Sequence, residues 1–171
     1  AQFLRIELLV GLAGGLMPAA LFLLNTVRAQ QPNLGKVVDG YLVNVDEQGV
    51  ILQGYDPVSL REGHSTKGEP QFQTKYKGAI YYFASADNKV RFEANPATYE
   101  PEFGGYCAYG VSVGHLAPIE LWTYDTTYQH RNLYQHNQKA LDGWKKDIPG
   151  NDKKAKKQWA KFRRKYVKKG L

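Results

Sequence analysis

An uncharged stretch of 17 residues, Leu8 to Leu24, is the longest apolar segment of the chain. A helix that crosses a bilayer usually contains about 20 predominantly apolar residues. The pattern therefore predicts one N-terminal transmembrane helix within residues 1–29. A cleavable signal peptide is the alternative, because Val27-Arg28-Ala29 resembles a small-x-small cleavage site. We favour the uncleaved anchor, because an arginine is unusual within such a site.

Small residues along this segment mark a candidate contact surface. Gly11, Gly14 and Gly15 would allow a neighbouring helix to approach closely. We therefore predict that these glycines contact an integral membrane protein within the lipid bilayer. The signal-like character of the segment also predicts export, with a single-pass topology and the following domain on the periplasmic or otherwise extracytoplasmic side.

Short apolar groups separated by polar turns follow the anchor. Residues 30–48 predict a polar linker and a leading strand, and residues 49–150 predict one domain. Lys77-Gly78 separates two of the apolar groups by two residues, which predicts a β-hairpin. The predicted strands in this part are residues 41–45, 50–52, 71–76 and 79–84.

Helix boundaries are marked by capping residues. Asp56 followed by Pro57 predicts the start of a helix, and Gly63 predicts its end. Ser85 predicts a second helix that stops before Pro96. The predicted core residues of the domain are Ile51, Tyr55, Val58, Phe72, Tyr82, Phe83, Val90, Phe92 and Tyr99.

The second half of the domain contains two further strands and a helix. Residues 122–124 and 132–134 predict the strands, and residues 136–146 predict the helix. Pro149-Gly150 is predicted to end this helical region, and Asn151 or Asp152 is predicted to cap the last helix.

The last helix, residues 151–171, is predicted to be basic and amphipathic. Its apolar side chains at 155, 159, 162 and 166 share one helical face. Either this face packs on the domain and the charges are solvated, or the helix lies on anionic lipid or docks on an acidic protein. Trp159, Arg163 and Arg164 are the candidate partner-binding residues of the second alternative.

The charge of the chain is concentrated in this tail. The protein has 171 residues and a formal net charge of +7. Of the 23 Lys and Arg residues, 13 lie between Lys139 and Leu171 together with 3 of the 16 Asp and Glu residues, so this part carries +10 and the first 138 residues carry −3. A basic patch also suits nucleic acid, but we expect no nucleic-acid partner for an exported, anchored domain.

Several motifs in the middle of the chain resemble the YHS domain family, in its small, mostly exported branch with a single cysteine. The matching stretches are Gly54-Tyr55-Asp56-Pro57-Val58, Phe83-Ala84-Ser85-Ala86-Asp87-Asn88-Lys89, Asn95-Pro96 and Gly104-Gly105-Tyr106-Cys107-Ala108-Tyr109-Gly110. The resemblance covers about residues 49–112. It implies a small α+β fold with short antiparallel strands and packed helices.

The resemblance also raises the question of a metal site. Cysteine-bearing relatives have a Tyr-x-Phe-Cys-Ser-x-x-Cys type of stretch whose thiolates bind metal, and Ala84 and Asn88 fall at the two cysteine positions here. The remaining candidate is Cys107 with His115 or another histidine, and a copper or zinc site needs three or four such donors. The alternative is that Cys107 is a small buried core residue.

The function predicted from the sequence is non-catalytic. The chain contains no phosphate-binding loop and no dinucleotide fingerprint, and Cys107 lacks a local base and orienting group for nucleophilic catalysis. We therefore predict no cofactor and an accessory subunit that docks on a larger membrane protein complex of photosynthetic or respiratory electron transfer. The alternative is a copper- or zinc-binding YHS domain for metal handling.

Overall fold

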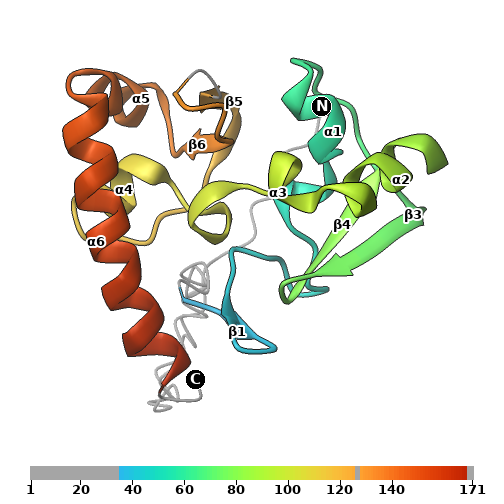
Figure 1. Ribbon diagram of the computed structural model, residues 1–171, viewed down its shortest axis with the longest axis horizontal. Coiled ribbons are helices and arrows are strands. Elements are labelled where there is room, and N and C mark those ends of the chain that lie inside the picture. Colours follow the sequence, from blue (N-terminus) through green and yellow to red (C-terminus); the bar gives the residue numbers. More distant parts are fainter. Residues whose placement is uncertain (1–34, 126–127, 169–171) are drawn as a thin grey trace, which may run out of the picture.

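The computed structural model describes residues 35–125 and 128–168 and has a mixed α+β fold (Figure 1). Its strands form short antiparallel pairs, as predicted. The strands are β1 (Val37–Val38), β2 (Tyr41–Leu42), β3 (Glu69–Tyr76), β4 (Ala79–Phe83), β5 (Glu120–Asp125) and β6 (Leu133–Gln135). The helices are η1 (Leu52–Gly54), α1 (Pro57–Arg61), α2 (Ala86–Ala94), α3 (Pro96–Tyr99), η2 (Glu102–Gly105), α4 (Ala108–Ser112), α5 (Gln138–Lys145) and α6 (Ile148–Val167).

The predicted hairpin is confirmed: β3 pairs with β4 around Lys77 and Gly78. Both turn residues have positive φ, 45° and 77°, as the mirror-image two-residue turn of a hairpin requires. A Cβ added to Gly78 would lie 2.3 Å from the Val38 carbonyl oxygen. Only glycine therefore fits where the turn packs against β1.

The helix starts at Asp56 and Ser85 are also confirmed. The Asp56 side chain accepts hydrogen bonds from the first turn of α1, and the Ser85 side chain accepts one from the backbone of Asn88 in α2. Pro96 does more than stop α2, because it occupies the first turn of α3. The predicted strand at residues 50–52 is present only as isolated bridges, in which Val50 pairs with Ile80 and Ile51 with Val45. Leu52 has a φ of 54° and begins a 3₁₀ turn, so it was assigned wrongly.

The start of the last helix was also predicted wrongly. Asp147 caps α6 by accepting a hydrogen bond from the backbone of Gly150, and Pro149 lies in the first turn. Proline is favoured there because its missing N–H would have no partner. Asn151 lies inside the helix, where its amide donates to the carbonyl oxygens of Gly143 and Trp144. These two hydrogen bonds join α5 to α6.

Two apolar clusters stabilise the fold. The first lies between the hairpin, α1 and α2 and includes Phe83 and Phe92, whose ring centroids are 5.2 Å apart. The second packs α4, α5 and β6 against α6, and α6 runs along one side of the molecule (Figure 1). Of the predicted core, Ile51, Val58, Phe83 and Phe92 are buried, and Tyr55, Phe72, Tyr82 and Tyr99 are partly buried. Val90 was assigned wrongly, since 62% of it is exposed.

The apolar stripe of α6 packs on the domain, which was the first of the two alternatives. Ala155 is buried, and the Trp159 ring lies 6.0 Å from Phe103 and 6.2 Å from Tyr106 between centroids. None of the helices within residues 35–125 and 128–168 is long and apolar enough to cross a membrane. The predicted anchor, with Gly11, Gly14 and Gly15, lies outside the described residues.

Candidate functional site

A buried carboxylate connects three elements of the domain. Asp56 is fully buried, and its Oδ1 accepts hydrogen bonds from Val58 N at 2.8 Å and Ser59 N at 3.3 Å. Its Oδ2 accepts from Ala84 N at 2.8 Å and from Asn88 Nδ2 at 2.6 Å. Four donors therefore satisfy this side chain, and they join the start of α1 to the end of β4 and to α2. We call this set the Asp56 node.

Two members of the Asp56 node, Ala84 and Asn88, are the residues that the resemblance described above aligns with the cysteines of cysteine-bearing YHS domains. Ala84 contributes its backbone N–H and Asn88 contributes its side-chain amide, and both donate to the same carboxylate oxygen. Hydrogen bonds to a carboxylate are stronger than those between neutral groups. These two hydrogen bonds connect the end of β4 and helix α2 to the start of α1.

Cys107 lies in the interior at the start of α4. Its Sγ accepts a hydrogen bond from Gly110 N at 3.2 Å and donates one to Gln135 Oε1 at 3.5 Å. Gln135 Oε1 also accepts from Tyr109 N at 3.0 Å. Burial raises the pKa of the Cys107 thiol. Burial therefore favours the neutral thiol, although the Gly110 N–H donor acts in the opposite direction, whereas a metal ligand must be a thiolate.

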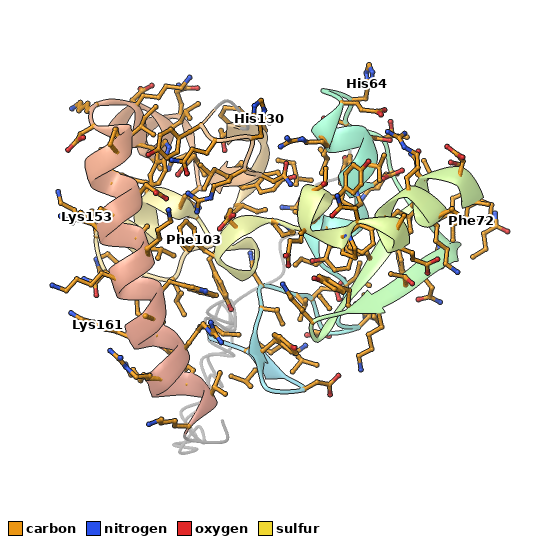
Figure 2. The ribbon with its side chains drawn as sticks, viewed as in Figure 1. His64, Phe72, Phe103, His130, Lys153 and Lys161 are labelled. Atoms are coloured by element: carbon orange, nitrogen blue, oxygen red, sulfur yellow. The ribbon has the colours of Figure 1, made fainter. Side chains whose placement is uncertain are left out.

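All four histidines are exposed, whereas Cys107 is buried. His115 is exposed, and its backbone N–H donates to the Gly110 carbonyl oxygen at 2.8 Å. Figure 2 shows His64 and His130 at the surface on separate parts of the chain. Among the described residues, no group of three or more His, Cys, Asp or Glu side chains is placed to hold a metal ion. A site of Cys107 and His115 stays a prediction.

The state of Cys107 can be checked by alkylation. We expect the native protein to react with a thiol reagent at pH 8 at least about tenfold more slowly than the unfolded chain, because burial blocks access and the raised pKa lowers the thiolate fraction. The rate should still be rising above pH 9, where a free cysteine levels off. A fast native reaction with a plateau near pH 7 would contradict this arrangement.

A groove lies between α6 and the segment that carries β2 and η2. Its volume is about 340 Å³, and its aromatic and cationic lining includes Tyr41, Phe103, Trp159 and Arg163. We call it the α6 groove. Two of the three predicted partner-binding residues of the last helix, Trp159 and Arg163, therefore lie together. Arg164 lies outside this groove, in an adjoining depression of the α6 surface that Arg163 also lines.

The other walls of the α6 groove were not predicted from the sequence. Tyr41 is 44% exposed, whereas Leu42 beside it is buried, so the strand alternation could have identified Tyr41 as outward-facing. Phe103 and Gly104 follow each other with φ of 52° and 60°. A Cβ on Gly104 would lie 2.2 Å from the Leu42 carbonyl oxygen. The close approach of η2 to β2 is a tertiary feature that the Gly-Gly pair alone does not specify.

The Asp56 node, the hairpin and α2 form a small α+β domain, and the comparison with protein families identifies it. The model of the YHS domain family matches residues 56–102. The chain therefore contains a YHS domain, as its motifs indicated. The match runs from Asp56 to Glu102, so α4, β5, β6, α5 and α6 follow it in the chain. The comparisons with curated proteins and with solved structures found no match.

Proposed function

We propose that this chain is a non-catalytic, membrane-anchored accessory subunit that docks on a larger membrane protein complex and stabilises it. The apolar stretch from Leu8 to Leu24 would supply the anchor. The YHS domain with its C-terminal helices would lie on the periplasmic or otherwise extracytoplasmic face of the partner. A photosynthetic or respiratory electron-transfer complex is the class of partner that we propose.

The α6 groove is the observation that carries this proposal. Tyr, Trp and Arg are the residue types enriched at the energetic centres of protein interfaces, and the groove combines Tyr41, Trp159 and Arg163. Trp159 is supported from behind by Phe103 and Tyr106. A side chain held in place before binding loses little conformational entropy when a partner docks.

The Asp56 node supports a role without a family-type metal site. Ala84 and Asn88, at the thiolate positions, are used to connect α1, β4 and α2. In this interpretation the YHS domain acts as a rigid support, and binding takes place on its surface.

Purification of the native protein in mild detergent tests the proposal. The same fraction should be examined by mass spectrometry for co-migrating proteins and by elemental analysis for metal. We expect a stoichiometric membrane complex without metal on this chain. A free protein that carries about one copper or zinc per chain would contradict the proposal and support metal handling instead.

A pair of exposed aromatic residues sharpens this test. Replacing Tyr41 with Ala should weaken partner binding by roughly 30-fold, the effect of about 2 kcal/mol at an interface centre. Trp122 is the matched control, because it is 63% exposed and lies on β5, outside the lining of the α6 groove.

Both variants should keep the thermal stability of the parent, because both side chains are exposed at the surface, Tyr41 to 44% and Trp122 to 63%. Co-purification of the partner with a Trp122→Ala variant but not with Tyr41→Ala is the expected result. The opposite pattern, or equal binding of both variants, would remove the α6 groove from the interface.

A further inference from the structure

The outward face of α6 carries a dense row of cations. Lys157, Lys161, Arg164 and Lys168 follow each other at spacings of four, three and four residues, so they share one face. Figure 2 shows Lys153 and Lys161 projecting from α6 away from the rest of the fold. Apart from Lys156, which pairs with Asp152, none of the exposed cations of α6 forms an ion pair with a described residue.

The N-terminal part of the chain reaches the fold near the C-terminal end of α6. Gly35, the first described residue, lies against the ring of Tyr166, since a Cβ added to Gly35 would come within 2.5 Å of Tyr166 Cε1. Its backbone N–H donates to Tyr106 Oη at 3.2 Å. The polypeptide from the N-terminal segment therefore joins the fold beside the last turns of α6.

This position places one half of the helix near the proposed membrane anchor. Ten residues separate Leu24, the end of the apolar stretch, from Gly35, and a chain of that length spans at most about 35 Å. Arg164 and Lys168 lie at the same end of α6 as Gly35. Lys153 lies about 17 Å further along the helix axis than Arg164, which is twice the Debye length of about 8 Å at physiological ionic strength.

The local surface fits an anionic headgroup. Ala160, Arg163, Arg164, Val167 and Lys168 line a shallow depression of about 350 Å³ on α6. The depression combines cations for a phosphate group with two apolar side chains for the adjoining glycerol and acyl region. Juxtamembrane clusters of Lys and Arg are attracted to anionic leaflets, and a short tether raises the effective concentration of such a weak site.

We propose that the C-terminal half of the outward face of α6, centred on Lys161, Arg164 and Lys168, binds anionic phospholipid headgroups. The inference rests on the membrane anchor of the proposed function. It adds a second membrane contact that fixes the orientation of the domain, with α6 inclined so that its C-terminal end meets the bilayer and its N-terminal end stays in solvent.

The test uses the full chain in nanodiscs of phosphatidylcholine alone or with added phosphatidylglycerol. The readout is the rate of acetylation of Lys161, measured by mass spectrometry relative to that of Lys145 at the end of α5. We expect Lys161 to react at least about fivefold more slowly in the anionic nanodiscs, the effect of roughly one cation held at the surface. Lys145 should react equally in both.

Two charge-reversal variants locate the contact. Arg164→Glu combined with Lys168→Glu should abolish the protection of Lys161. Lys153→Glu combined with Lys154→Glu changes the net charge equally, but both residues lie in the first two turns of α6, about 10–12 Å along the helix axis from Lys161, and the protection should stay intact. Equal loss in both variants would overturn the inference, because it would indicate a diffuse attraction of the whole chain.

The remaining outcomes separate this inference from the anchor. A chain that enters the nanodiscs but reacts at equal rates in both lipids overturns the lipid contact alone. Protection of Lys161 in native membranes but not in anionic nanodiscs would assign the face to an acidic protein and would also overturn it. A chain that fails to enter either nanodisc overturns the anchor and, with it, this inference.

Discussion

Replacing Asp56 with Asn is expected to lower the free energy of unfolding by about 3–5 kcal/mol, although the two side chains have almost the same shape. Both carboxylate oxygens accept hydrogen bonds from donors: Val58 N and Ser59 N at Oδ1, and Ala84 N and Asn88 Nδ2 at Oδ2. An amide has one oxygen and one NH₂ group. In either orientation its NH₂ group faces a backbone N–H donor.

Rearrangement of the Asp56 node could satisfy only some of the unpaired groups in the Asp56→Asn variant. Asn88 could turn its amide and present an oxygen to the new NH₂ group, but the backbone N–H of Ala84 would still lack an acceptor. A buried donor without a partner costs about 1–3 kcal/mol, and the charge-assisted bonds are lost as well. Native proteins are stable by only about 5–15 kcal/mol, so the variant should lose a large share of its stability.

Chemical and thermal unfolding measure this loss. We expect a fall in Tm of roughly 10 °C or more. Asp87→Asn is the matched control, because Asp87 is an exposed residue in the first turn of α2 and its interaction with the helix dipole contributes less than about 1 kcal/mol. Similar losses in the two variants would show that the Asp56 node does not hold the domain together.

The same residue shows where sequence reasoning succeeds and where it stops. The cap that Asp56 provides for α1 involves residues two and three positions away, and such local chemistry is readable from Asp-Pro. Its bonds to Ala84 and Asn88 span 28 and 32 positions. They exist only because β4 and α2 return to the start of α1, which no local pattern specifies.

Errors in the core and in the last helix have related causes. Val90 lies on a nine-residue helix with a single fully buried side chain, Phe92, so the apolar pattern did not define which face is buried. Pro149 was interpreted as a stop, although proline serves equally well in the first turn of a helix that Asp147 caps. The α6 groove and the entry of the chain at Gly35 beside Tyr166 are tertiary features. Of the residues involved, the sequence analysis had singled out Trp159 and Arg163 as partner-binding candidates.

One partly buried cation, Arg131, connects Glu102 at the end of the YHS domain to α6. Arg131 donates from Nε and Nη2 to the two oxygens of Glu102, both at 2.9 Å, and from Nη1 to Asp152 Oδ1. Its guanidinium carbon also lies 5.7 Å from the centroid of the Phe103 ring. The side chains of Arg131 and Asp152 are only 14% and 6% exposed. The hydrogen bonds to Glu102, followed by those to Asp152, raise the pKa of Arg131.

Replacing Arg131 with Met should therefore lower the free energy of unfolding by about 2–3 kcal/mol. The substitution leaves the buried Asp152 with Lys156 as its remaining ion-pair partner, and it removes the cation from Glu102, whose side chain is 35% exposed. Methionine can still pack against Phe103, so the loss of stability measures the contribution of the guanidinium group and its hydrogen bonds. Lys75→Met is the control: Lys75 pairs with Asp39 at 2.8 Å, but both side chains are 59% exposed, and such a pair contributes less than about 1 kcal/mol.

Hydrogen exchange and a second substitution distinguish a specific connection from general damage. In Arg131→Met the backbone amides of α6 should exchange faster while those of α2 keep their protection, because the broken bonds lie at Asp152 and Glu102. Adding Asp152→Asn should restore part of the stability, since it removes a carboxylate that Arg131 no longer balances. Uniformly faster exchange, or a further loss in the double variant, would show that Arg131 supports the fold as a whole rather than the attachment of α6.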